Sequence, residues 1–317
     1  MTAESPTTPA TVPADAATGV RTGLGVSFGT FGELLQGALA GPDEDFLVTL
    51  PIARWSTAQV TLTPGADGLR VEPAGKLKAL RVARSVLARY GDGHGGTLVL
   101  TGDLPEGKGM SSSSADLVAT VRAVADALGI PLPPQEIETY LRSIEPTDGL
   151  MYSEVVAFHH RKVRLCRTLG PVPPMTIVGV DEGGQVDTVN FNASRPVVPA
   201  AERGEYGVLL DRLAAALAEG DLAAVGRIST RSAELNQARC HKRHLDRMLE
   251  IRRDIGALGV AVAHSGTMVG LLISGADAGY DGKLADAVAA GTELAGTVSV
   301  DHTLSVPAPR RYRGARP

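Results

Sequence analysis

Residues 102–116 read Gly-Asp-Leu-Pro-Glu-Gly-Lys-Gly-Met-Ser-Ser-Ser-Ser-Ala-Asp, and they say more about the fold than any other stretch of the chain. The run Thr97–Leu100 precedes them, and residues 117–128 follow with apolar side chains at helical spacing. We therefore expect a strand, a glycine-containing loop and the start of a helix in succession. Backbone N–H groups and the positive end of a helix dipole then point at one place, where a phosphate group binds readily.

This stretch resembles a Walker A loop only in part. Gly102, Gly107 and Lys108 have the Walker A spacing, but Gly109 stands where a Ser or Thr must bind magnesium. A P-loop NTPase is therefore disfavoured. The hydroxyl groups lie at residues 111–114 instead, in the first turn of the expected helix. A flexible loop that ends in a serine N-cap is the alternative, although one cap needs only one serine.

The composition is ordinary for a soluble globular protein. The chain has 317 residues, of which 44% are hydrophobic and 21% charged, enough for one large or two modest domains. Aromatic residues make up 4% and the net charge is −4, so a nucleic-acid-binding surface is not expected. The most apolar window, 257–273, is too short and too interrupted to cross a membrane.

Cysteine and histidine usage argues against disulfide bonds and metal sites. Cys166 and Cys240 lack CxxC spacing, which disfavours a disulfide framework and a structural zinc site and fits a reducing cytoplasm. The histidine pairs at 159–160 and 241–244 have no nearby third ligand, so we expect surface histidines. Residues 1–20 are rich in Thr, Pro and Ala, lack the features of a signal peptide, and are predicted to form a disordered tail.

Hydrophobic periodicity predicts a mixed order of helices and strands. Strands are expected at 25–27, 46–52, 58–63, 69–72, 97–100, 175–180 and 297–300, with a glycine-broken pair of strands before the last helix. Helices are expected at 76–90, 117–128, 135–144, 150–160, 201–218, 221–236, 244–258 and 276–290. The strands come in groups, which favours an α+β fold over a doubly wound sheet. The proline-rich segment 169–174 predicts a boundary between domains at 21–170 and 171–317.

The first of three further segments spans residues 29–37. Glu33 and Gln36 lie three residues apart at the end of an expected strand, where the carboxylate and the carboxamide could hold a polar substrate or a metal-bound water. The alternative is a Glu at a helix start and a solvated Gln.

The second and third segments are 145–148 and 263–270. Pro146 and Gly149 fix a bend that is expected to place Asp148 at or near a helix start, where the dipole favours its ionised form. There it could accept a proton from a substrate hydroxyl, or simply cap the helix. Residues 263–270 form a small-residue loop where backbone must come close to another group, or else a tight turn between two buried strands.

Taken together, these segments resemble the GHMP kinases (galactokinase, homoserine kinase, mevalonate kinase and relatives). The second motif of that family is Pro-x-x-x-Gly-Leu-Gly/Ala-Ser-Ser-Ala, and residues 105–115 match it with Met110 in place of Leu. The loop Gly266–Gly270 resembles the third motif. Within the family, the L-threonine kinase branch, which serves cobalamin nucleotide-loop assembly, is similar to this chain at residues 32–37, 107–110, 112–113, 115–116 and 145–148.

The resemblance implies an N-terminal α+β domain of the ribosomal-protein-S5 type and a ferredoxin-like C-terminal domain, with ATP and Mg²⁺ in the cleft between them. It implies catalytic roles for Asp148 and Ser112, and magnesium binding by Ser112 and Ser113. The nucleotide-binding residues that it implies are Pro105, Gly107, Lys108, Gly109, Met110, Ser111, Ser112, Ser113, Gly266 and Thr267. The substrate-binding residues that it implies are Glu33, Gln36, Thr147 and Asp148.

One departure from the family pattern affects the mechanism. Several relatives carry Lys or Arg near the position of Gly29 or Thr30, where this chain has no basic residue. Lys108 either substitutes for it or faces solvent. A homodimer is compatible with the sequence, which is otherwise silent on assembly.

The expected reaction is transfer of the γ-phosphoryl group of ATP to the side-chain hydroxyl of L-threonine, giving O-phospho-L-threonine. The first alternative is a kinase of the same fold that acts on another small hydroxylated metabolite, such as a homoserine-like compound or a secondary-metabolite intermediate. The second is a nucleotide-binding regulator that has lost catalysis.

Overall fold

The computed structural model describes residues 19–91, 93–172, 174–184 and 198–304. The tail expected at residues 1–20 therefore lies outside the described residues, except for Gly19 and Val20. The strands are β1 (Arg21–Ala38), β2 (Asp45–Pro64), β3 (Leu69–Glu72), β4 (His94–Gly102), β5 (Val155–His159), β6 (Arg164–Gly170), β7 (Met175–Asp181), β8 (Gly259–Val262), β9 (Met268–Ser274) and β10 (Val298–His302). The helices are α1 (Leu77–Tyr90), α2 (Ser112–Leu128), α3 (Pro134–Arg142), α5 (Ala200–Glu219), α6 (Leu222–Asn236), α7 (Leu245–Ile255) and α8 (Tyr280–Ala295).

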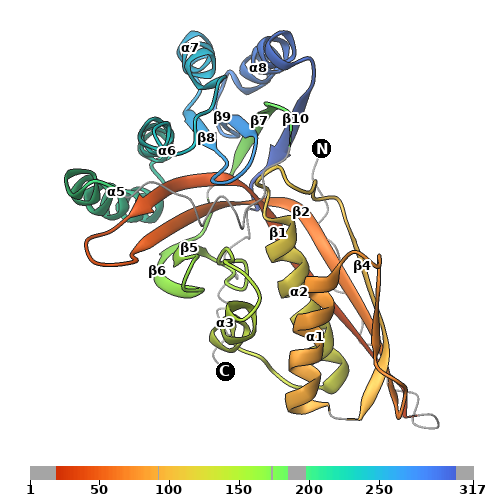
Figure 1. The fold of residues 1–317 in the computed structure, drawn as a ribbon. Helices are drawn as coiled ribbons and strands as arrows, with labels where there is room; N and C mark the ends of the chain where they lie inside the picture. The colour runs from red at the N-terminus through yellow and green to blue at the C-terminus, as the bar shows by residue number, and fades with distance from the viewer. Residues whose placement is uncertain (1–18, 92, 173, 185–197, 305–317) are drawn as a thin grey trace, which may run out of the picture.

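One continuous sheet runs through the molecule in the order β10-β7-β9-β8-β1-β2-β4-β3, and the β5–β6 hairpin branches from β2. The long antiparallel strands β1 and β2 reach from one half of the protein into the other (Figure 1). The strands are grouped and mostly antiparallel, so the predicted α+β class is confirmed.

In the N-terminal half, α2 packs against β1, β2 and β4, and α1 lies beside α2 and contacts β3 (Figure 1). Their apolar faces bury residues such as Val60, Leu98 and Val121, none of which is exposed to solvent. Helix α2 lies so close to β1 that a Cβ atom at Gly25 would come within 2.0 Å of the Ala119 carbonyl oxygen. This close approach holds the middle of α2 against β1.

In the C-terminal half, four antiparallel strands have the order β10-β7-β9-β8. Along the chain, α5, α6 and α7 lie between β7 and β8, and α8 lies between β9 and β10. This is the order of a ferredoxin-like sheet, as expected. Its edge strand β8 joins β1 through the pair Glu33–Val262. Among the described residues, no helix has the length and apolar character needed to cross a membrane.

Three expectations about individual elements were wrong. Residues 150–160 are not a helix: Val155–His159 form β5, because their bulky apolar side chains pack between β2 and β6 and are buried on both faces. The strand β6 was not predicted, because its residues are mostly polar and partly exposed. The strands expected at 46–52 and 58–63 are one strand, β2. Arg54 and Trp55 interrupt the apolar pattern, and the pairing with β1 shifts its register there and then continues.

Candidate active site

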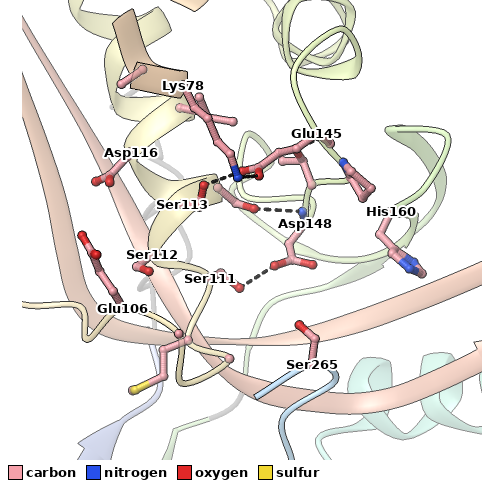
Figure 2. Close-up of a pocket in the computed structure, with 18 of the residues that line it drawn as sticks. Lys78, Glu106, Ser111, Ser112, Ser113, Asp116, Glu145, Asp148, His160 and Ser265 are labelled. Carbon is pink, nitrogen blue, oxygen red and sulfur yellow. Dashed lines mark hydrogen bonds and ion pairs between the residues drawn. The ribbon is translucent and has the colours of Figure 1, made fainter. Parts of the chain in front are cut away.

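A cleft of about 790 Å³ lies where the start of α2 faces the loop before β5. Figure 2 shows the side chains that converge on it from these two segments, from α1 and from the β8–β9 loop. Its polar lining consists of Glu33, Lys76, Lys78, Glu106, Ser111, Ser112, Ser113, Ser114, Asp116, Glu145, Thr147, Asp148, His160, His264 and Ser265. The cleft therefore brings together residues that lie far apart in the sequence.

The loop before α2 has an unusual backbone. Gly107, Gly109 and Ser111 have φ values of 72°, 82° and 58°, so every second residue is left-handed. Alternation of this kind turns successive N–H groups toward one point and forms an anion-binding nest. Helix α2 begins at Ser112 with no acidic residue in its first turn, so its unsatisfied N–H groups and dipole favour an anion at the same place.

The loop packs on the turn between β8 and β9. A Cβ atom at Gly266 would lie 2.0 Å from the Lys108 carbonyl oxygen, so only glycine fits there. The Thr267 amide donates to that same carbonyl at 3.1 Å. The two glycine-containing segments predicted to bind phosphate thus support each other directly. Of the two, the 263–267 turn reaches the cleft through His264 and Ser265, while Gly266 and Thr267 lie behind it.

Lys108 does not line the cleft. Its Nζ forms an ion pair with Asp181 at 2.6 Å and donates to the Gly184 carbonyl at 2.8 Å. Thr267 also donates its hydroxyl to Asp181. Of the two alternatives for Lys108, the structure therefore supports neither: the side chain ties the loop to the end of β7.

The four serines at the start of α2 have different partners. Ser111 donates to Asp148, Ser113 donates to Glu145, and Ser114 accepts from the Asp148 amide at 3.4 Å. Ser112 makes no side-chain hydrogen bond with any residue that the structure describes. None of them caps the helix, since Ser111 at the N-cap position has no side-chain bond to the first turn.

Asp148 lies in the loop between α3 and β5, and no helix starts there. The expectation that a helix dipole favours its ionised form was therefore wrong. Burial raises the pKa of Asp148, the Ser111 hydrogen bond acts in the opposite direction, and the charge of Glu145 adds to the rise. A raised pKa makes the carboxylate a better proton acceptor.

Glu33 reaches the cleft because β1 is irregular. The register against β2 shifts between Phe28 and Gly29 and twice between Thr30 and Leu35, and Gly32 has a φ of 56°. Bulges of this kind redirect side chains beside active sites. Glu33 is 3% exposed, and its Oε2 has no hydrogen-bond partner among the described atoms. Burial raises its pKa well above the usual value, and Asp148 adds to the rise.

Gln36 is fully buried and does not line the cleft. The side-chain nitrogen Nε2 of Gln36 donates to the Val262 carbonyl at 3.3 Å, and its side-chain oxygen Oε1 lies 2.8 Å from Nδ1 of His264. Gln36 thereby assigns the Nδ1 proton of His264 and fixes the ring in the cleft wall. The His264 ring makes an edge contact with His160 at a centroid distance of 4.9 Å.

Two lysines, Lys78 in α1 and Lys76 directly before it, enter the cleft from the other side. Lys76 binds Glu106 and Asp116, each at 2.6 Å, and Lys78 pairs with Glu145 (Figure 2). Glu106, Asp116 and Glu145 are thus each paired with a lysine.

Of the sequence-predicted site residues, nine line the cleft: Glu33, Gly107, Gly109, Met110, Ser111, Ser112, Ser113, Thr147 and Asp148. Pro105, Lys108, Gln36, Gly266 and Thr267 do not. The sequence reasoning missed the lining residues Lys76, Lys78, Glu106, Asp116, Glu145, His160, His264 and Ser265. It placed His159 and His160 on the surface, although both are buried; the apolar residues on either side of this pair were the available signal.

The residues present suit a magnesium ion that is held mainly by a nucleotide. Ser112 offers a hydroxyl oxygen that forms no hydrogen bond with the described residues, and it lines the same cleft as Glu106 and Asp116, which are labelled in Figure 2. Within the described ranges, no group of three or more His, Cys, Asp and Glu side chains could hold a metal ion alone. Magnesium typically binds through one or two protein oxygens together with substrate phosphates.

Comparison with known proteins identifies relatives of both halves. Residues 78–155 match the GHMP kinases N-terminal domain, and residues 213–289 match the GHMP kinases C-terminal domain. The L-threonine kinase of Salmonella typhimurium is 27% identical over 249 residues, which cover 76% of this chain and 80% of that protein. A shikimate kinase of Halobacterium salinarum is 41% identical over a shorter stretch of 78 residues, 23% of this chain and 28% of that protein.

Solved structures show the same fold. A homoserine kinase from Cytophaga hutchinsonii superposes with a TM-score of 0.67 at 16% identity, over 90% of this chain and 95% of that one. The L. major mevalonate kinase in complex with R-mevalonate gives a TM-score of 0.64 at 18% identity, over 92% and 97%. The chain therefore belongs to the GHMP kinases and contains both the N-terminal and the C-terminal domain of that family.

Proposed function

We propose that this protein is an ATP-dependent kinase that transfers the γ-phosphoryl group to the side-chain hydroxyl of L-threonine. The observation that carries the proposal is the cleft itself, where the anion-binding start of α2 and the Asp148 carboxylate face the same space. A phosphate donor and a hydroxyl acceptor can meet there. The similarity to an L-threonine kinase over 76% of the chain favours that acceptor.

Phosphoryl transfer depends on positioning and charge stabilisation more than on covalent chemistry. In the proposed reaction, the nest at residues 107–111 and the first N–H groups of α2 hold the phosphates. The Asp148 carboxylate accepts the proton of the attacking hydroxyl. Ser112, assisted by Ser113, would hold Mg²⁺, which when bound offsets the charge of the phosphates.

The acceptor end of the cleft suits a small zwitterion. Glu33 places beside Asp148 a buried carboxylate oxygen that has no hydrogen-bond partner among the described residues. Such a group is unfavourable unless a ligand supplies the missing charge. We assign to it the ammonium group of the amino acid, with Thr147 nearby in the cleft wall. Gln36, which was expected to bind substrate, contributes through His264.

Two further parts of the proposal have less behind them. A role in cobalamin nucleotide-loop assembly rests on the resemblance alone, and a cytoplasmic location rests on the cysteine usage. The boundary between the domains near residue 170 and a homodimeric assembly also stay predictions.

The test is ADP release with a panel of acceptors: L-threonine, L-serine, L-homoserine, mevalonate and shikimate. We expect the highest kcat/KM with L-threonine and formation of O-phospho-L-threonine, identified by mass. A higher value with homoserine, mevalonate or shikimate would replace the threonine assignment and keep the kinase. No turnover of any acceptor, together with tight nucleotide binding, would favour the regulator.

A further inference from the structure

We propose that Thr30 and Ser111 form a relay of two hydroxyl groups that positions the Asp148 carboxylate and keeps it ready to accept a proton. Thr30 is then a positioning residue at the place where a basic side chain is missing from this chain. The inference rests on the proposed role of Asp148 as the base.

The hydrogen bonds of the relay run in one direction. Ser111 donates its hydroxyl proton to Oδ2 of Asp148. A hydroxyl has only one proton, so the contact of 2.6 Å between Oγ of Ser111 and Oγ1 of Thr30 must be donated by Thr30. Each donation strengthens the next, because a polarised hydroxyl is a better donor.

The backbone of Ser111 indicates that its hydroxyl has a function. Its φ of 58° and ψ of 28° are left-handed, a conformation that disfavours residues with a Cβ and suits glycine. The position has a serine nevertheless, and the side chain does not cap α2. Strain of this kind persists where it aims a group that is needed, and here the hydroxyl is aimed at Asp148.

Thr30 is fully buried in β1 and does not line the cleft. Its amide donates to the Met110 carbonyl at 3.2 Å, which ties β1 to the loop beside Ser111. Thr30 therefore acts on the cleft only through Ser111. A substitution there changes the relay without removing a group that substrate or nucleotide would touch.

Hydroxyl groups, and not cations, position the Asp148 carboxylate. From β1 it faces Glu33, from its own loop Glu145, and from the other walls of the cleft His160 and His264. Lys78, the nearest lysine on α1, is paired with Glu145. Among the described residues, no Lys or Arg forms an ion pair with Asp148. The Ser111 hydrogen bond is the interaction that lowers the pKa of Asp148.

The test compares Thr30→Val with Thr30→Ser in pH profiles of kcat/KM for the acceptor. Without the Thr30 hydroxyl, Ser111 donates more weakly, so the acidic limb of the profile moves to higher pH. We expect kcat on that limb to fall roughly threefold to tenfold, the range for one neutral hydrogen bond, with KM for ATP unchanged. Thr30→Ser keeps a hydroxyl and should restore the wild-type profile.

A matched control is Thr120→Val, which removes another fully buried hydroxyl from the same half of the protein. Oγ1 of Thr120 has no hydrogen-bond partner in the part of the chain that the structure describes, so the profile should stay that of wild type. Ser111→Gly tests the other link. Glycine relieves the left-handed strain, so we expect a higher Tm together with a lower kcat and a shifted acidic limb.

A second readout does not depend on turnover. In protein with ¹³C-labelled aspartate carboxyls, the Asp148 signal is assigned by its loss in Asp148→Asn and titrated by NMR. We expect its pKa to rise in Thr30→Val and in Ser111→Gly. Superimposable titrations in all variants would overturn the relay. If wild type phosphorylates no acceptor, the proposed function fails, and the NMR titration still decides whether the relay exists.

Discussion

Two buried carboxyl groups, Glu33 and Asp148, share the cleft, and their surroundings separate them chemically. Asp148 accepts a hydrogen bond from Ser111, whereas Oε2 of Glu33 has no partner among the described atoms. Pairs of titratable groups in different surroundings often have different roles. The hydrogen-bonded one suits a proton acceptor that must be held in place, and the unpartnered one suits a cationic ligand.

Replacing Asp148 by Asn removes the proposed base while keeping the shape of the side chain. We expect kcat to fall by roughly 10²-fold or more, the usual scale for a general base. ADP release at saturating acceptor measures this. Asp246→Asn, at an exposed position of α7, is the control and should match wild type. Near-normal turnover of Asp148→Asn would remove Asp148 from the mechanism.

Glu33 is expected to destabilise the free protein at neutral pH. Its raised pKa means that the folded state binds a proton more tightly than the unfolded state. The stability that this proton provides is present at low pH and is lost as pH rises through the folded-state pKa. Glu33→Gln, which stays neutral, should therefore raise the Tm at pH 8 and have little effect at pH 4.

Thermal unfolding of wild type and Glu33→Gln across this pH range checks the expectation. The control is Glu154→Gln, at an exposed glutamate before β5 that makes no hydrogen bond or ion pair with described residues. An equal change of Tm at both pH values would contradict the assignment of Glu33 as a strained buried acid.

At the scale of elements, the serines at the start of α2 differ in their partners. Ser111, Ser113 and Ser114 form hydrogen bonds with the Asp148 loop, whereas Ser112 forms no side-chain hydrogen bond with any described residue. If Ser112 and Ser113 hold magnesium, the double variant Ser112→Ala and Ser113→Ala should need several-fold more Mg²⁺ for half-maximal turnover.

A magnesium titration at fixed ATP checks this, with Ser85→Ala as the control. Ser85 lies on α1, and its hydroxyl donates only within that helix. A magnesium dependence that is unchanged in the double variant would reject the assigned role of both serines.

Elements with strong local patterns could be predicted from the sequence. The amphipathic helix α1 and the strand-loop-helix at β4 and α2 lie where periodicity placed them. The helix predicted at 150–160 was wrong because a short apolar run fits a buried strand as well as a helix. Pairing with β2 and β6 makes residues 155–159 a strand. The bulges of β1 could not be predicted either, since they depend on its pairing with both β2 and β8.

At the scale of the whole molecule, the loop before α2, which is proposed to bind phosphate, is held from the C-terminal half. The ion pair Lys108–Asp181 and the packing of Gly266 under the loop connect it to β7 and to the β8–β9 turn. Lys242, which is 2% exposed, donates to the Gly266 carbonyl from behind. The conformation of the nest thus depends on contacts between the two halves of the chain.

Asp181→Asn should loosen this support without touching the cleft. We expect KM for ATP to rise several-fold and kcat to change less, because a partly exposed ion pair contributes about 1 kcal/mol or less. The charge exchange Lys108→Asp with Asp181→Lys should recover part of the loss. Asp277→Asn breaks a comparable pair with Lys283 on the far side of the C-terminal half and serves as the control. An unchanged KM for ATP in Asp181→Asn would show that the pair does not support the loop.

The sequence by itself determined the local backbone features of this protein. Glycines at 107 and 109, the serines after them and an apolar helix predict an anion-binding loop, because backbone conformation and helix start are local properties. The tertiary structure alone decided which side chains share the cleft. His160, His264, Lys76 and Glu145 come from four separate segments. It also decided the ionisation of Asp148, which is set by burial and by Ser111 instead of a helix dipole. Such effects act through space between distant residues, so no local pattern in the chain contains them.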